Sequence, residues 1–144
     1  MAEKYVLDTY ALLALLQDEP GAQTVADLIA SDETTVLMSI INLGEAFYII
    51  LRAHGEEEAS TVENKVFETA KIKIAGAPWE RVRAAARLKA EGGLSFADCF
   101  AAALSEESGA ILVTGDPEFQ PLEEKGIIRV LWLAGPDGTP TPEP

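Results

Sequence analysis

The sequence has little of the chemistry used by thiol, histidine and zinc enzymes. Its 144 residues include one cysteine, Cys99, and one histidine, His54. These counts exclude an intramolecular disulfide and zinc sites built from several Cys and His ligands, and they fit a reducing compartment. Cys99 stands among apolar residues, which predicts a place in the core. A catalytic thiol would need His54 as its base, and His54 precedes Gly55 where we expect a helix to end.

Long apolar runs and an excess of positive charge are also missing. No apolar run reaches the ~18 residues of a membrane span, and the opening MAEKYVLDTY lacks the features of a signal peptide. We therefore expect a cytoplasmic protein without a membrane partner. The chain carries 11 Lys and Arg against 24 Asp and Glu, a net charge of −13. This balance argues against tight, non-specific binding to nucleic acid and suits a cation or a basic partner.

Short apolar runs alternate with helical patterns over most of the chain. We predict strands at 4–8, 35–38, 71–76, 111–114 and 127–133, and helices at 9–17, 20–30, 42–54, 56–71, 78–91 and 95–108. Apolar strands that alternate with helices indicate a parallel sheet covered on both faces, here in a single domain over 1–133. Residues 134–144 are rich in Pro and Gly and are predicted to form a flexible tail. In such sheets, ligands bind at the carboxyl ends of the strands.

Three aspartates stand where helices are expected to begin. Asp8 ends the first strand, and Asp116 follows the fourth strand and precedes Pro117. Asp98 follows Ser95 at the spacing of a capping box. Each of the three, taken alone, is explained as a helix cap or as an acid in a first helical turn.

Glu45 has no such explanation, because it lies inside the predicted helix at 42–54. A helical wheel places it with Tyr48, Ile49 and Arg52, opposite the apolar side. The side chain is then either an exposed acid, an acid facing Arg52, or part of a site. Arg52 lies two turns beyond Glu45 on the same face, where it could contact a phosphate group or simply pair with Glu45.

Taken together, the four acids point to a cation site. If the first and fourth strands are neighbours, Asp8 and Asp116 face each other across one cleft. Clustered carboxylates repel, so a cation must offset them or some must stay protonated. Oxygen ligands without His or Cys suit Mg²⁺ or Mn²⁺, ions that can activate water and stabilise charge on a phosphate. The hydroxyls near these strand ends could orient the carboxylates, or be ordinary strand-end and cap residues; they belong to Thr9, Ser39 and Thr114.

The order of these motifs resembles that of a PIN domain, the ribonuclease fold used by the toxins of VapBC-type toxin–antitoxin pairs. The resemblance runs from VLDTYALLALL to IIRVLWL, nearly the whole chain. It rests on DTYALL with Asp8, NLGEAFY with Glu45, LSFADCFAAAL with Asp98, and TGDPEF with Asp116. All four motifs follow in the family's order and with family-like spacing.

The resemblance implies a three-layer α/β/α sandwich with a central parallel sheet and one acidic pocket. In that pocket Asp8, Asp98 and Asp116 would bind one or two Mg²⁺ or Mn²⁺ ions, and Glu45 would either ligate a metal or orient the attacking water. Glu118 would be an outer acid or a surface charge. The implied activity is that of an endoribonuclease, which hydrolyses RNA phosphodiester bonds with a metal-activated water. The implied biology is a toxin that forms a homodimer and is held by a small antitoxin protein.

Two other functions compete with this interpretation. A non-catalytic PIN-like binding module would use the acidic pocket to dock a metal or a partner; the negative charge favours it, and the presence of all four acids counts against it. A haloacid-dehalogenase-like phosphatase needs a second Asp two residues after the first, where Tyr10 stands. The cations of 80–89 are expected to form a solvated surface rather than a phosphate track, because they are scattered around a helix.

Overall fold

The computed structural model describes residues 3–133, so the predicted tail at 134–144 lies outside the described residues. The strands are β1 (Glu3–Leu7), β2 (Thr34–Ser39), β3 (Ile72–Ala75), β4 (Ile111–Thr114) and β5 (Arg129–Trp132). The helices are α1 (Thr9–Leu16), α2 (Ala22–Ala30), α3 (Ile40–His54), α4 (Glu56–Glu68), α5 (Trp79–Glu91), α6 (Phe96–Ser108) and α7 (Gln120–Glu124), with a short 3-10 turn at Pro117–Phe119. Every predicted strand and helix is present, with ends shifted by up to three residues.

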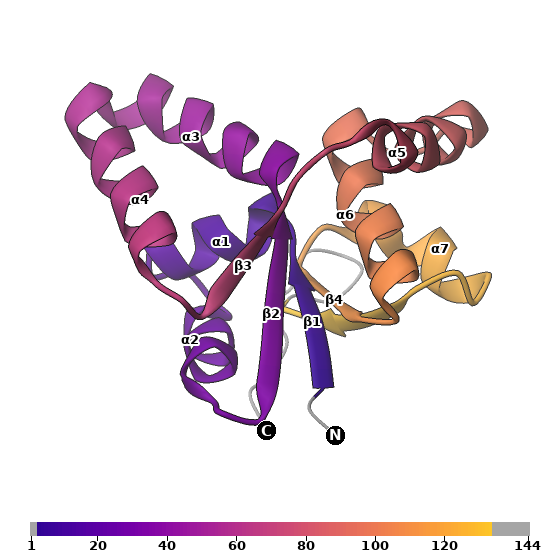
Figure 1. Cartoon of the computed structure of the whole chain (residues 1–144), viewed down its shortest axis with the longest axis horizontal. Helices are drawn as coiled ribbons and strands as arrows, with labels where there is room; N and C mark the ends of the chain where they lie inside the picture. The colour runs from indigo at the N-terminus through magenta and orange to yellow at the C-terminus, as the bar shows by residue number, and fades with distance from the viewer. Residues whose placement is uncertain (1–2, 134–144) are drawn as a thin grey trace.

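All five strands are parallel and lie in the order β3-β2-β1-β4-β5. The first and fourth strands are therefore neighbours, with Leu7 opposite Val113. From β1 the chain moves outward to β3 on one side, and from β4 it moves outward to β5 on the other (Figure 1). The strand order thus reverses between β1 and β4, which is where open α/β sheets bind ligands.

Side chains of the strands alternate between two cores, one on each face of the sheet. Leu7 and Val113 pack with residues of α1 to α4, whereas the preceding residues, Val6 and Leu112, pack with residues of α5 to α7. Figure 1 shows α1 to α4 on one side of the strands and α5 to α7 on the other. This arrangement confirms the α/β/α sandwich, and it follows from the period-two alternation of strands that are apolar on both faces.

Two element ends are set by the backbone. Helix α3 ends at His54 as predicted, with Gly55 at φ 91°. Helix α2 begins at Ala22, two residues later than predicted, because Gly21 adopts φ 95°, which lies outside the right-handed helical region. A Cβ at Gly21 would also lie 2.9 Å from the Cβ of Leu133. Within residues 3–133, no helix has both the length and the apolar character needed to cross a bilayer.

Candidate active site

Asp8 is fixed from two directions at the carboxyl end of β1. It is 1% exposed, and one of its carboxylate oxygens accepts a hydrogen bond from the backbone N–H of Ala11 at 2.8 Å. The other oxygen accepts a short hydrogen bond, 2.5 Å, from the hydroxyl of Thr114 at the end of β4. Asp8 is therefore the N-cap of α1, and its side chain also links the end of β1 to the end of β4.

Thr114 also positions the next acid. Its hydroxyl oxygen accepts a hydrogen bond from the backbone N–H of Asp116 at 3.0 Å. Asp116 in turn accepts from the backbone N–H of Glu118 at 2.9 Å, which begins the 3-10 turn. One hydroxyl thus connects the turn after β4 to the carboxylate after β1.

Asp98, Asp116 and Glu118 converge. Each offers a carboxylate oxygen, and the three atoms lie within 4.8 Å of one another. Divalent cations bind oxygens at about 2.0–2.6 Å, so ligands on one ion stand at most about 5 Å apart. Asp98 is buried in the first turn of α6, where its backbone N–H donates to the hydroxyl of Ser95 at 3.1 Å. From the sequence, Glu118 was either an outer acid or a surface charge, and the structure puts it in the same cluster.

The site raises the pKa of two carboxyl groups. Burial is the main cause at Asp8, whose pKa rises to about 8, although the Thr114 and Ala11 hydrogen bonds oppose the shift and the Asp98 and Asp116 charges add to it. Burial also raises the pKa of Asp98 to about 7, with further contributions from Asp116, Glu45 and Glu118 and an opposing one from Ser95. The charges of Asp116, Glu45 and Glu118 thus act on Asp98, and those of Asp98 and Asp116 act on Asp8.

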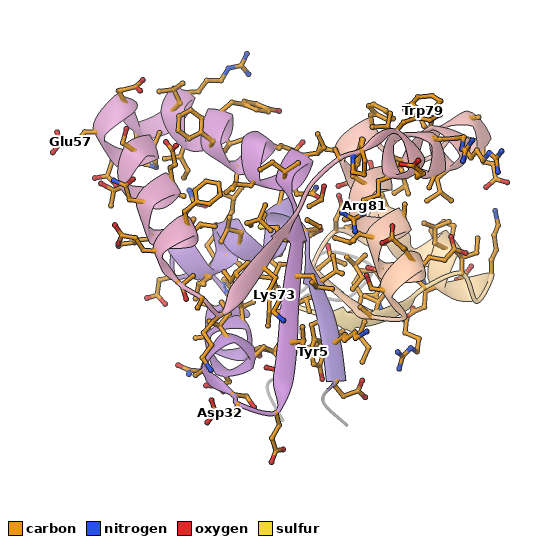
Figure 2. The ribbon with its side chains drawn as sticks, viewed as in Figure 1. Tyr5, Asp32, Glu57, Lys73, Trp79 and Arg81 are labelled. Atoms are coloured by element: carbon orange, nitrogen blue, oxygen red, sulfur yellow. The ribbon has the colours of Figure 1, made fainter. Side chains whose placement is uncertain are left out.

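The ion pairs found in residues 3–133 lie outside this cluster. Lys71 pairs with Asp32 at 3.0 Å, and Arg81 pairs with Glu107 at 3.1 Å (Arg81 and Asp32 are labelled in Figure 2). Close, hard oxygen donors that form no ion pair within the described residues are a donor set that suits Mg²⁺ or Mn²⁺. The chemistry of the residues therefore fits the expected metal.

Asn42 connects the three segments that carry Asp8, Glu45 and Asp98, and sequence reasoning missed it. Its amide nitrogen donates to the hydroxyl of Thr9 at 3.3 Å and to the carbonyl of Ala97 at 3.1 Å. The Thr9 hydroxyl in turn donates to the backbone carbonyl of Asn42 at 3.2 Å. Asn42 is 0% exposed, and its side-chain oxygen has no hydrogen-bond partner within the described residues. An amide among apolar residues in the first turn of α3 was the signal that could have revealed it.

The other two predicted hydroxyls do not hydrogen-bond to an acid. The Thr9 hydroxyl contacts Asn42 as described, and the Ser39 hydroxyl accepts from the N–H of Ile41 at 3.2 Å as the cap of α3. Thr114 is the one of the three that contacts a predicted acid. On the outer part of α3, the guanidinium of Arg52 lies 5.6 Å from the centre of the Tyr48 ring, a cation–π contact.

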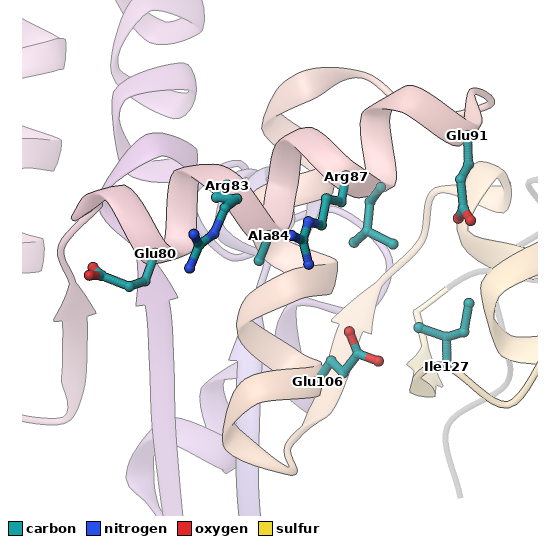
Figure 3. A pocket seen from close by; sticks show the side chains of 8 residues that line it. Glu80, Arg83, Ala84, Arg87, Glu91, Glu106 and Ile127 are labelled. Atoms are coloured by element: carbon teal, nitrogen blue, oxygen red, sulfur yellow. The ribbon is translucent and has the colours of Figure 1, made fainter.

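The cations of α5 do not form a basic track. Arg81 is paired with Glu107, and Lys89 donates to the carbonyl of Leu94 at 2.8 Å. Arg83 and Arg87 lie on one side of α5, with Glu106 of α6 across from them (Figure 3). Glu80 and Glu91 line the same hollow, so its charges are mixed. The expectation of a solvated surface fits this arrangement.

Comparison with known proteins identifies the family. The model of the PIN domain matches residues 5–125. This chain belongs to the PIN-domain family. It is 30% identical over 121 residues to "Ribonuclease VapC30" of Mycobacterium tuberculosis, a match that covers 80% of this chain and 92% of that protein.

Solved structures show the same PIN fold. The toxin VapC20 of Mycobacterium tuberculosis, described as cleaving the sarcin-ricin loop, superposes with a TM-score of 0.66 at 20% identity, covering 81% of this chain and 93% of its own. The VapBC2 complex of Rickettsia felis, bound to a DNA fragment from its promoter, superposes with a TM-score of 0.68 at 19% identity, covering 89% and 97%. At these sequence identities, the superpositions establish a similarity of fold and nothing about function.

Proposed function

We propose that this PIN domain is a divalent-metal-dependent endoribonuclease that hydrolyses RNA phosphodiester bonds. The observation that carries the proposal is the convergence of the oxygens of Asp98, Asp116 and Glu118 within 4.8 Å, beside the buried Asp8. The cluster lies where the strand order reverses, the usual ligand site of such a sheet. The match to a ribonuclease of the same family supports the reaction class.

Each acid has a role that its surroundings support. Asp8, Asp98 and Asp116 would hold one or two Mg²⁺ or Mn²⁺ ions, with Glu118 beside them, and Glu45 would either ligate a metal or orient the attacking water. A bound ion of this kind lowers the pKa of a coordinated water and stabilises negative charge that develops on a phosphate. Thr114 would keep Asp8 and the turn bearing Asp116 in register, because its hydroxyl contacts both.

We also propose that the protein is the toxin of a cytoplasmic toxin–antitoxin pair and forms a homodimer. The family relatives named VapC and VapBC support the assignment as a toxin. An apolar groove between α3 and α4 would receive an apolar segment of the antitoxin. The groove is lined by Ile40, Leu43, Gly44, Phe47, Val62, Glu63 and Phe67. Two of these apolar side chains are exposed, Phe67 at 56% and Ile40 at 36%.

The test is cleavage of an unstructured RNA by the purified protein with Mg²⁺, with Mn²⁺ and with a chelator. Asp98→Asn removes one charge and keeps the backbone hydrogen bond to Ser95, so it is expected to abolish cleavage in a folded protein. Asp32→Asn is the matched control, because Asp32 is an exposed acid that precedes β2 and lies at the opposite end of the strands (Figure 2). Metal binding without cleavage of any RNA would support the non-catalytic binding module instead.

A further inference from the structure

The proposed ribonuclease must hold RNA with few free cations near its acids. The net charge is −13, and the cations of α5 are paired, bonded to backbone or mixed with glutamates, as described above. RNA binding that depends on phosphate contacts needs several Lys or Arg side chains. Single strands are also bound by base stacking on aromatic rings, at about 1–3 kcal/mol per base. With few cations available, exposed aromatic rings around the acids are the other means by which the protein could hold RNA.

Tyr10 is an exposed aromatic ring at the edge of the acidic cluster. It stands two residues after Asp8 and is 40% exposed. Its ring lies directly over the backbone of Gly115, the residue before Asp116: a Cβ at Gly115 would be 2.3 Å from both Cε1 and Cζ of Tyr10. The ring is therefore held between the segments that carry two of the acids, against a surface with no side chain, and it remains open to solvent.

Tyr48 is a second exposed ring, one helical turn from Glu45 on α3. Residues three apart on a helix share a face, so Tyr48 continues the face of Glu45. It is 46% exposed, and the guanidinium of Arg52 lies 5.6 Å from its ring centre. An aromatic ring and a guanidinium plane are both surfaces on which unpaired bases stack. Arg52 is exposed as well, so it can also reach a phosphate.

We propose that Tyr10 and Tyr48 are base-stacking residues that flank the acidic cluster, and that stacking rather than phosphate contact provides most of the affinity for RNA. The inference rests on the proposed ribonuclease function and adds the residues that hold the substrate. Stacking requires bases free of a helix, so the substrate is unpaired RNA at the scissile position.

The first test measures steady-state cleavage of an RNA with an unpaired segment by wild type and Tyr10 variants. Tyr10→Ala is expected to raise KM about tenfold or more, since one stacked base is lost. Tyr10→Phe and Tyr10→Trp keep a ring and are expected to keep KM close to that of wild type, whereas Tyr10→Leu keeps the bulk and is expected to behave like Tyr10→Ala. Trp79→Ala is the control, because Trp79 is an exposed ring at the start of α5 and is not part of the acidic cluster.

A fluorescent base distinguishes stacking from a purely structural role. With 2-aminopurine in the unpaired segment, wild type is expected to quench the fluorescence on binding, and Tyr10→Ala and Tyr48→Ala to lose part of the quenching. The affinity is expected to depend weakly on salt, with a log–log slope of about −0.7, the value for one phosphate contact by Arg52. A slope of several units would overturn the proposal, because phosphate contacts would then dominate.

Gly115→Ala provides an independent test without changing Tyr10 itself. The added methyl would occupy the place of the ring, so the end of the Tyr10 side chain must move. We expect KM to rise toward that of Tyr10→Ala while the melting temperature changes little. If wild type cleaves RNA but these variants leave KM unchanged, the stacking proposal is wrong and the ribonuclease stands. If wild type cleaves no RNA, the proposed function itself fails.

Discussion

Replacing Asp98 by Asn is expected to stabilise the metal-free protein at pH 8. The carboxyl of Asp98 has an ordinary pKa of 3.8 and a pKa of about 7 in the folded protein. Between these values the folded state binds more protons than the unfolded chain, so the free energy of unfolding falls as the pH rises. The penalty is absent below about pH 4, grows up to about pH 7 and then stays near 4 kcal/mol, at about 1.4 kcal/mol per pKa unit.

Asn cannot ionise, so the variant loses this part of the pH dependence. From pH 5, which is above the isoelectric point of about 4.3, to pH 8, the stability of Asp98→Asn relative to wild type is expected to rise by about 3 kcal/mol. Urea unfolding followed by circular dichroism, with a chelator at each pH, measures the difference. Asp32→Asn is the control for general removal of negative charge, since Asp32 is exposed and distant from the cluster.

A divalent ion is expected to offset much of this penalty at pH 8 and so to narrow the difference in stability between wild type and Asp98→Asn. At a hundredfold excess over its dissociation constant, Mn²⁺ would stabilise wild type by about 2.7 kcal/mol and the variant by much less. If Asp98→Asn differs from wild type by the same amount at pH 5 and pH 8, the charge of Asp98 is not destabilising. The electrostatic argument for a cation site would then be refuted.

Substitutions at four further positions test the residues that support the site and the fold. Thr114→Val removes the hydroxyl that contacts Asp8 and the turn after β4, so we expect a loss of about 1–3 kcal/mol in urea unfolding, which Thr114→Ser largely restores. Asn42→Leu breaks the hydrogen bonds between α1, α3 and α6, and we expect a similar loss of stability, with a larger loss of kcat than of RNA affinity. Gly44→Ala places a methyl in open space within α3 and should raise stability by about 0.5–1 kcal/mol, whereas Gly21→Ala, at φ 95°, should lower the melting temperature.

Local patterns were sufficient to predict the five strands and helices α1 to α6, but not α7. The apolar runs that form β1 and β4 are each followed within two residues by an aspartate that directly precedes a helical turn. This local pattern was enough to single out Asp8 and Asp116 from the sequence. The capping-box spacing of Ser95 and Asp98 located the start of α6 to within one residue. These features depend on residues close in sequence, so they can be read from the sequence.

Contacts between distant segments could not be predicted. The amide of Asn42 meets Thr9 and Ala97 across a sequence separation of 33 and 55 residues. The ring of Tyr10 over Gly115 depends on the pairing of β1 with β4, and nothing near Tyr10 in the sequence signals it. For Glu118 the sequence likewise could not decide between an outer acid and a surface charge, because its proximity to Asp98 arises only when the turn after β4 folds against α6.

The central claim is that the clustered acids bind a divalent ion used to cleave RNA. The most direct test follows Mn²⁺ binding and RNA cleavage on the same samples as Mn²⁺ is titrated into wild type and Asp116→Asn. We predict that binding and cleavage by wild type saturate over the same range of Mn²⁺, and that the variant loses both while remaining folded. Equal Mn²⁺ binding by the two proteins, or cleavage by wild type that persists without any metal, would contradict the account.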